Sequence, residues 1–409
     1  MTSDLSIEMV DEVRPPARIK VVGVGGAGGS AVNRMIRSGL KGVDFIVINT
    51  DLKALEHNLA PVKIQIGKNI TRGLGAGTDP NKGREAAEEE AEEIAAALKD
   101  TDMIFIAAGE GGGTGTGASP IVARIAREMG ILVIAIVTKP FAFEGGRRMA
   151  IAEQGIKTLR ENVDTLVVIP NQRLLSIADA KTSFLDSFKQ ADSVLYDATR
   201  SIADLITDYG NIVGVDFADV RAIMTGSGDA LMGVGVAVGE ERGKKAALMA
   251  LHSPLLEQID ITGAQGVLIH ITGSSEMTLF EINEAAMEVI NAAGENANVI
   301  FGATADDNLG EAIRVTVIAT GFGKKDAAPL RPQPDLSMDF QSRRSPNLDI
   351  PTKVRREQEA ELFKSDAVPP KGNGGGRIHL EVDLDGEPPA DFGVPAFLRK
   401  NGHREEARL

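Results

Sequence analysis

Two glycine-rich segments, each directly after a run of apolar residues, constrain the fold of this chain more than any other feature. The first glycine loop (23–29) closes the apolar run Ile19–Val24, and the second glycine loop (109–117) follows Met103–Ala108. Glycine this dense destabilises a fold unless the backbone must approach another group closely. Successive backbone N–H groups in such loops can point into one anion-binding nest, and threonine hydroxyls add donors. We therefore expect both loops at the C-terminal ends of strands in one sheet, where they cradle an oligophosphate together.

The first glycine loop, taken alone, leaves several kinds of nucleotide site open. Residues 23–28 (GVGGAG) fit G-x-G-x-x-G, which lets the backbone approach a phosphate at a helix N-terminus. Asp51 lies about 20 residues further on, where dinucleotide-binding folds have their ribose contact, so a nicotinamide-dependent oxidoreductase also fits. A purely structural turn and other nucleotide folds fit as well. A kinase or P-loop ATPase is disfavoured, because the sequence has no G-x-x-x-x-G-K-[ST] and neither loop contains lysine.

Apolar strands that alternate with helices indicate an α/β fold with a Rossmann-like parallel sheet covered on both faces. In the first half we expect strands at Ile19–Val24, Val43–Asn49, Met103–Ala108, Ile131–Val137 and Thr165–Ile169, and helices at Arg84–Lys99 and Pro120–Met129. A helix over Asp186–Asp208 is long enough to bridge to a second, smaller α/β domain. There we expect strands at Gly266–Ile271, Val299–Ala303 and Ile313–Ala319, and helices at Lys244–Ala250 and Phe280–Ala293.

The two ends of the chain differ in composition from the part between them. Residues 1–17 form a short polar leader. Residues 324–390 are rich in Pro, Asp, Arg, Lys, Gly and Ser, and we expect a disordered linker because they offer too little apolar area to offset chain entropy. The apolar run Phe392–Leu398, followed by Arg399 and Lys400, predicts a peptide at 391–409 that docks on a partner.

The composition excludes several classes of function. A net charge of −14 and an aromatic content of 4% disfavour direct contact with nucleic acid or an anionic membrane. The chain has no cysteine and its five histidines lack H-x-x-x-H spacing, so we expect no metal site built by the protein. The N-terminus lacks the apolar run of a secretory signal, and no apolar run is long enough to cross a bilayer. We expect a cytoplasmic protein without direct membrane insertion.

The second glycine loop also carries a family resemblance. Residues 111–117 (GGGTGTG) resemble the tubulin signature of the tubulin and FtsZ superfamily in its bacterial FtsZ form. Other segments resemble FtsZ blocks in the same order, namely 18–33 (RIKVVGVGGAGGSAVN), 73–77 (GLGAG), 138–148 (TKPFAFEGGRR), 169–174 (IPNQRL), 215–220 (VDFADV) and 314–321 (RVTVIATG). The resemblance covers about residues 18–323. It implies a GTP-binding domain at 18–184, a central bridging helix at 185–209 and a C-terminal domain with the catalytic loop at 210–323.

The resemblance also implies which residues bind GTP or GDP, with Mg²⁺ accompanying the nucleotide. The implied contacts are Gly26, Ala27, Gly28, Gly29 and Ser30 in the first glycine loop, Gly113, Thr114 and Gly115 in the second, and Thr138, Glu144, Arg148, Asn171, Phe188 and Asp192 elsewhere. The segment 73–77 is implied to sense the terminal phosphate. An aromatic face over the base and a carboxylate that accepts from the N1–H and N2–H₂ donors of the purine would explain a preference for guanine.

Asp216 and Asp219 are the implied catalytic pair. Because they are three residues apart, both carboxylates would lie on the same side of a helical turn. In FtsZ this loop enters the nucleotide site of the next subunit and polarises the attacking water, and phosphoryl transfer needs little more than an oriented water and charge stabilisation. The resemblance therefore implies a GTPase activated by head-to-tail self-assembly, which forms the cytokinetic ring beneath the membrane at the division site. The segment 395–400 (PAFLRK) resembles the FtsZ peptide that docks on membrane-tethering adaptors of the FtsA type, and this implies a docking segment at 391–400.

Three residues depart from the FtsZ pattern. Gly214 stands where FtsZ usually has Asn, Ser30 replaces another usual Asn, and Glu110 occupies an apolar position beside the signature. Loss of the amide at position 214 would slow hydrolysis if that amide orients the water. The alternative is an FtsZ-like paralogue with weak or no hydrolysis that binds GTP and acts as a co-assembling scaffold. A nicotinamide-dependent enzyme would need a hydride-transfer site, and the sequence offers no obvious His or Tyr/Lys constellation for one.

Overall fold

The structure, a computed structural model, describes residues 17–175, 183–207, 211–256 and 261–322. Its strands are β1 (Ile19–Val24), β2 (Val43–Asn49), β3 (Val62–Gln65), β4 (Met103–Gly109), β5 (Leu132–Lys139), β6 (Thr165–Pro170), β7 (Asn211–Val213), β8 (Gly228–Ala237), β9 (Gly266–Gly273), β10 (Asn298–Ala305) and β11 (Ile313–Thr320). Its α-helices are α1 (Gly25–Arg37), α2 (Leu52–Glu56), α3 (Lys68–Thr71), α4 (Pro80–Glu89), α5 (Ala91–Ala97), α6 (Thr114–Glu128), α7 (Gly146–Arg160), α8 (Asn171–Leu174), α9 (Phe184–Ile206), α10 (Phe217–Met224), α11 (Arg242–Leu251) and α12 (Leu279–Ala293). Short 3-10 helices lie at η1 (Ala142–Glu144), η2 (Pro254–Leu256) and η3 (Asp307–Leu309). The predicted linker (324–390), the docking peptide (391–409) and residues 1–16 of the leader lie outside the described residues.

One 11-stranded sheet runs through the described part of the chain in the order β3-β2-β1-β4-β5-β6-β8-β11-β9-β10-β7. Strands β1 to β6 are all parallel, and their order is that of the Rossmann fold. β8 pairs with β6 in parallel, whereas β11 is antiparallel to both β8 and β9. The predicted α/β class with a Rossmann-like parallel half is thus confirmed. The boundaries between the two proposed domains stay a prediction.

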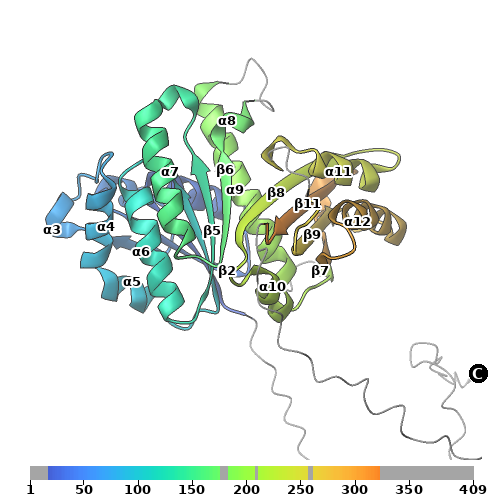
Figure 1. Cartoon of the computed structure of the whole chain (residues 1–409), viewed down its shortest axis with the longest axis horizontal. Coiled ribbons are helices and arrows are strands. Elements are labelled where there is room, and N and C mark those ends of the chain that lie inside the picture. Colours follow the sequence, from blue (N-terminus) through green and yellow to red (C-terminus); the bar gives the residue numbers. More distant parts are fainter. Residues whose placement is uncertain (1–16, 176–182, 208–210, 257–260, 323–409) are drawn as a thin grey trace, which may run out of the picture. The chain divides into compact units, whose positions relative to one another are not determined.

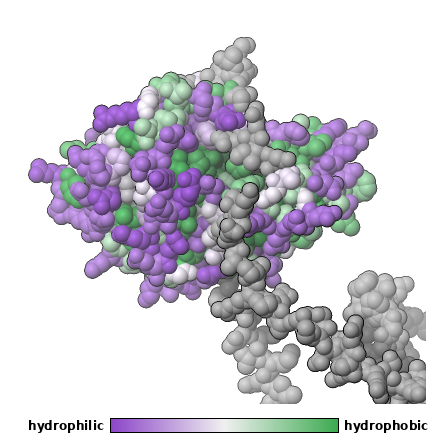
Figure 2. All heavy atoms as spheres, in the orientation of Figure 1, coloured by the Kyte–Doolittle hydropathy of each residue, from purple (hydrophilic) through white to green (hydrophobic). Residues whose placement is uncertain are grey.

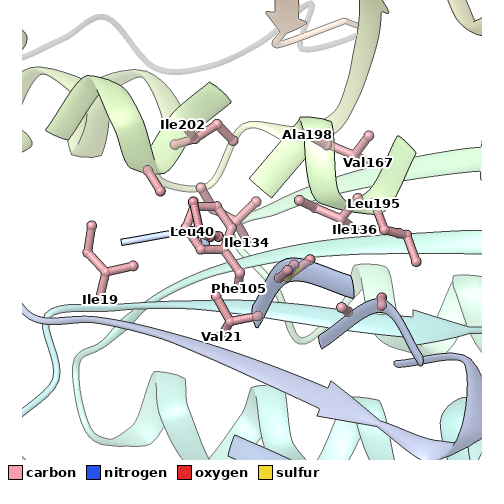
Figure 3. Packing of buried hydrophobic residues seen from close by; sticks show 14 of the residues in the cluster. Ile19, Val21, Leu40, Phe105, Ile134, Ile136, Val167, Leu195, Ala198 and Ile202 are labelled. Atoms are coloured by element: carbon pink, nitrogen blue, oxygen red, sulfur yellow. The ribbon is translucent and has the colours of Figure 1, made fainter. Parts of the chain in front are cut away.

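The parallel strands bury side chains on both faces, which explains their nearly continuous apolar sequences. On one face, Val21 and Phe105 pack under α1 and α9, as Figure 3 shows for Leu195, Ala198 and Ile202 of α9. On the other face, a second cluster of strand residues packs under α4, α5, α6 and α7. A third cluster lies in the C-terminal half, where α11 and α12 pack on β9 and β11. Helix α9 is therefore a core element of the fold.

The predicted helix Arg84–Lys99 is in fact two helices, α4 and α5. Helix α4 begins earlier than predicted, at Pro80, because Asp79 caps it by accepting from the Asn81 amide at 3.1 Å. The helical path breaks at Glu90, whose carboxylate accepts from the Gly67 amide at 3.0 Å. An Ala/Glu-rich sequence predicts a helix correctly, but a side-chain bond to a distant loop ends it.

Helix α6 begins at Thr114, inside the second glycine loop, and not at Pro120 as predicted. The glycines in its first turns allow a very close approach to α4. A Cβ added to Gly117 would lie 2.0 Å from the Pro80 carbonyl oxygen, and one on Gly83 would lie 2.2 Å from the Gly113 carbonyl oxygen. Part of the glycine density thus serves helix packing and not phosphate contact.

Hydrophilic side chains cover most of the face shown in Figure 2, with hydrophobic ones in smaller patches. In the part of the chain that the structure describes, no helix is both long and apolar enough to span a bilayer.

Candidate nucleotide-binding pocket

A pocket of about 340 Å³ lies at the C-terminal edge of the parallel strands. It is lined by Gly26, Ala27, Gly77, Gly109, Glu110, Gly112, Gly113, Thr114, Gly115, Thr138, Pro140, Glu144, Arg148, Asn171, Phe188, Ala191, Asp192 and Leu195. Most of these residues lie at or after the C-terminal ends of β1, β4, β5 and β6 or belong to α9, and Gly77 follows β3. The pocket therefore occupies the place where open α/β sheets bind ligands. Both glycine loops contribute to it, as the sequence predicts.

The two glycine loops touch each other at the floor of the pocket. Gly25 has a φ of +73°, and a Cβ there would lie 2.9 Å from the Gly115 amide nitrogen. A Cβ on Gly109 would lie 2.6 Å from the Ala27 side chain. Larger residues at these positions would separate the loops, so glycine is required by the close approach of two backbones.

Two helix N-termini point their backbone donors at this floor. Helix α1 begins at Gly25 and α6 at Thr114, and neither has a side-chain cap or an acidic residue in its first turn. By contrast, Thr278 and Glu281 form a capping box at the start of α12. Uncapped first-turn amides and the positive end of the helix dipole form a binding site for anions. The floor of the pocket can therefore hold phosphate groups without a lysine.

The opposite end of the pocket has the features of a purine site. Phe188 packs edge-on against Phe141, with ring centroids 5.4 Å apart, which fixes its orientation. One turn further along α9, burial raises the pKa of Asp192 to about 6, although the positive charge of Arg34 lowers it in part. The Oδ1 atom of Asn171 is buried without a hydrogen-bond partner among the described residues. An aromatic face, a carboxylate and an unsatisfied amide oxygen can recognise a base that presents several N–H donors.

The wall between the two ends carries charged and hydroxyl groups. Arg148 in the first turn of α7 donates to Glu144 at 2.5 Å, and Glu144 also accepts from the Phe141 amide at 2.9 Å. Thr138, the penultimate residue of β5, is buried, and its carbonyl accepts from the Glu110 amide at 2.9 Å. Arg148 is held by its partner at the rim, where it can reach a phosphate or ribose.

Three of the predicted binding residues do not line the pocket. Gly28 lies against the sheet, where a Cβ would meet the Ala107 carbonyl oxygen at 2.2 Å. The carbonyl of Gly29 accepts from the Asn58 amide at 2.8 Å, and Ser30 is exposed on α1. Gly28 and Gly29 therefore let α1 lie close to its neighbours.

Sequence reasoning missed Thr50 and Arg34 near the pocket, and it identified the segment that contains Gly77 without naming that residue as a contact. The Thr50 hydroxyl is 2.6 Å from that of Thr114, and the Gly77 carbonyl accepts from the Gly113 amide at 2.8 Å. These bonds tie the end of β2 and the segment 73–77 to the second glycine loop. The Nε atom of Arg34 is buried and unpartnered among the described residues. Its position on the face of α1 that turns toward α9 could have been found from the 3.6-residue period alone.

Asp51, which would contact the ribose in a dinucleotide-binding fold, has another task. Its carboxylate caps α2 by accepting from the amides of Lys53 and Ala54 at 2.9 and 3.2 Å. It is not among the residues that line the pocket. The feature that favoured a nicotinamide-dependent enzyme is thus explained by helix capping.

Asp216 and Asp219 lie far from the pocket in the same chain. Asp216 is the N-cap residue of α10, Asp219 is in its first turn, and both are exposed. The Val215 amide donates to the Leu205 carbonyl at 3.1 Å, so their loop is attached to the C-terminal end of α9. Phe188, near the other end of α9, lines the pocket, and a rise of 1.5 Å per residue separates Phe188 from Leu205 by about 25 Å. In Figure 1, α8 lies near the top and α10 near the bottom of the coloured part of the chain.

No cluster of three or more His, Asp or Glu that could hold a metal ion occurs among the described residues.

Comparisons with known proteins agree with this geometry. Residues 18–179 match the model of the Tubulin/FtsZ family, GTPase domain, and residues 228–323 match that of the FtsZ family, C-terminal domain. A structure of an FtsZ dimer from M. jannaschii is 47% identical, covers 75% of this chain and 89% of its own, and superposes with a TM-score of 0.72. CetZ2 from Haloferax volcanii, solved as a protofilament with bound GTPγS, shares the fold at 21% identity and a TM-score of 0.64, with 74% of this chain and 92% of that chain covered. The pocket, the sheet order and these matches together lead to one conclusion: the chain belongs to the FtsZ family of tubulin-like GTPases.

Proposed function

We propose that this protein binds GTP with Mg²⁺ in the pocket at the C-terminal edge of the sheet and hydrolyses it only after head-to-tail assembly. In this proposal, Asp216 and Asp219 of one subunit complete the nucleotide site of the next. The filaments form the cytokinetic ring of a dividing bacterium, in the cytoplasm beneath the membrane. The observation that carries the proposal is the separation of the acidic pair from the pocket within one chain.

The length of α9 supports catalysis between subunits. A carboxylate about 25 Å from the pocket cannot orient a water molecule there. Because the acidic pair and the pocket lie near opposite ends of α9, stacking of identical subunits along this direction would bring the two together. Such a contact is heterologous and does not close on itself, so it generates a filament.

The pocket suits GTP in its donors and its size. The uncapped N-termini of α1 and α6 would hold the phosphates, Phe188 would stack on the base, and Asp192 would accept from the guanine N1–H and N2–H₂ groups. Mg²⁺ would neutralise charge on the phosphate oxygens. The two carboxylates of the next subunit would orient the attacking water and accept its proton.

An exposed apolar side chain in the segment 73–77 supports a subunit contact. Leu74, three residues before the pocket residue Gly77, leaves 86% of its surface exposed. A subunit seated over the pocket would bury it and gain about 1.5–3 kcal/mol.

Recruitment to the membrane is assigned to the C-terminal segment. We propose that residues 391–400 dock on division adaptors of the FtsA type, since the apolar run there is followed by two basic residues. The described helices offer no span of their own, so an adaptor would supply the membrane contact.

Gly214 motivates a second candidate, a paralogue that assembles on GTP but hydrolyses it weakly. Gly214 is exposed and precedes Asp216 by two residues, so no side-chain amide at that position can orient the water. Phosphate release and light scattering, followed in the same sample against protein concentration, separate the candidates. Release that rises where scattering begins supports the first, and scattering without release supports the scaffold.

Mixing two defective chains tests catalysis between subunits directly. An Asp219→Ala chain keeps its pocket, and an Asp192→Ala chain keeps its acidic pair, so neither should release phosphate alone. In a mixture of equal parts, about a quarter of the head-to-tail junctions join an intact pocket to an intact Asp219, and activity should return to that fraction. Co-sedimentation confirms that both chains enter the filament. Co-assembly without activity would reject the assignment of Asp219 to the neighbouring site.

A further inference from the structure

A residue that lines the nucleotide pocket carries a buried carboxyl group, which lies between α6 and α7. Glu110 follows directly after β4, lines the pocket beside Gly109 and Gly112, and is only 6% exposed. None of the roles proposed above uses it. A buried carboxyl without a cationic partner is rare, because the charged form loses its hydration.

The side chain of Glu110 is enclosed between α6 and α7. A Cβ added to Gly155 of α7 would lie 2.5 Å from its Oε2 atom and 2.1 Å from the methyl group of Thr116 on α6. Neither carboxyl oxygen has a hydrogen-bond partner of normal geometry among the described residues. The polar group beside it, the Thr116 hydroxyl, accepts from the Gly111 amide at 2.9 Å.

Among the described residues, no ion pair with a cationic group compensates for the burial of Glu110. Helix α6 presents Thr116 to the carboxyl, α7 presents Gly155, and β5 contributes only the Thr138 carbonyl that accepts from the Glu110 amide. Of the other charged residues that line the pocket, Glu144 and Arg148 pair with each other. Burial therefore raises the pKa of Glu110 to about 7, and the Thr116 hydroxyl lowers it only in part.

The ionised carboxylate of Glu110 and a bound phosphate group would repel each other near the N-terminus of α6. Glu110 lies four residues before the first residue of α6, and Thr116, which it contacts, is in the first turn of that helix. The positive end of the α6 dipole favours one anion in its vicinity, and a second nearby anion repels the first. Protonation of Glu110 removes the competing charge.

We propose that Glu110 is a positioning residue of the phosphate site, which binds a proton when the phosphates of the nucleotide enter and so makes nucleotide affinity depend on pH. The inference rests on the proposed GTP binding. It assigns a role to a position where the FtsZ pattern has an apolar side chain.

The sign of the effect follows from the charge. Above pH 7, Glu110 is mostly ionised in the free protein, and phosphate binding must first return the proton to it. If phosphate binding raises the pKa of Glu110 by one unit, GTP affinity should fall by up to about tenfold between pH 6.5 and pH 8.5. Near pH 7 the free group is about half protonated, so binding should take up about 0.4 proton per nucleotide through this group.

Isothermal titration calorimetry measures the number of protons taken up. The full chain is titrated with GTP below the assembly threshold, in buffers of different ionisation enthalpy. The test compares the unmodified chain with Glu110→Gln, which keeps the shape and loses the charge. Glu153→Gln is the matched control, because Glu153 lies on α7 with 63% of its side chain exposed. The terminal phosphate of GTP titrates with a pKa near 6 in all samples, so the difference between chains isolates Glu110.

The proposal would be established if Glu110→Gln abolishes the proton uptake and Glu153→Gln retains it. GTP affinity should also depend less on pH in Glu110→Gln than in the unmodified chain. Equal uptake and equal profiles in all three chains would overturn it. If Glu110→Gln does not fold, Glu110→Met provides the same comparison, and the absence of proton uptake by the unmodified chain would overturn the proposal without any variant. Failure of the unmodified chain to bind GTP at any pH would overturn the proposed function itself.

Discussion

Replacement of Gly117 by alanine tests whether the second glycine loop is held in place by helix packing. The new Cβ would lie 2.0 Å from the Pro80 carbonyl oxygen and 2.7 Å from the Arg84 amide nitrogen. Both are backbone atoms of α4, so the helix must move by more than about 1 Å before the contact becomes ordinary. Overpacking of this kind costs about 1–3 kcal/mol, and we expect a loss of at least about 2 kcal/mol in the free energy of unfolding.

The displacement of α4 should also weaken GTP binding, because Gly77, two residues before the cap of α4, accepts from the Gly113 amide at 2.8 Å. Urea denaturation with and without GDP measures both effects on one protein. Gly146→Ala is the matched control, since no atom lies within 4 Å of a Cβ added there and the change favours a helix. If Gly117→Ala is as stable as Gly146→Ala, the close contact between α4 and α6 does not exist and the argument fails.

Three further changes test other parts of the molecule. GTP affinity should fall as the pH drops through about 6, because protonated Asp192 cannot accept from guanine. Asp192→Asn should bind GTP weakly at every pH. If the pH profile of that variant equals that of the unmodified chain, Asp192 does not bind the base. Leu74→Ser should raise the assembly threshold about tenfold or more in sedimentation assays while GTP affinity below the threshold stays the same, and an unaltered threshold would remove Leu74 from the subunit contact. Removal of residues 392–409 should spare polymerisation in solution but abolish co-sedimentation with adaptor-coated vesicles, and retained recruitment would reject the docking peptide.

Five of the six strands β1 to β6 could be predicted closely from the sequence, whereas β3 and helix α7 were not predicted. Strands such as Val43–Asn49 are buried on both faces, so their apolar runs have clear limits. β8 was missed because its ten residues include three glycines and several exposed positions, which breaks the apolar pattern. β7 was missed because three residues carry no period at all. Strands that depend on pairing partners from distant parts of the chain leave little local signal.

Only some of the residues that line the pocket could be predicted from the sequence. Residues whose chemistry shows in the sequence, such as Thr114, Phe188 and Asp192, do line it. Gly28 and Gly29 belong to the same motif but face the protein interior, because glycine serves close packing as well as phosphate contact. A motif identifies which residues are special, and only the backbone path decides which of them meet the ligand.

The distance between the acidic pair and the pocket could not be predicted from the sequence motifs alone. Asp216 and Asp219 stand only some 25 residues after Asp192 in the chain, and only the family resemblance implied that they act in the site of the next subunit. Helix α9 separates the acidic pair from the pocket, because it continues without a break from Phe184 to Ile206 and carries the chain away from the pocket. Arg200 reinforces this arrangement, since it donates to Asp204 on the same helix at 2.8 Å and to Asp306 of the C-terminal half at 2.7 Å. An unbroken helix held in this way keeps Asp216 and Asp219 away from the pocket of their own chain, which is the physical basis for the proposed hydrolysis between subunits.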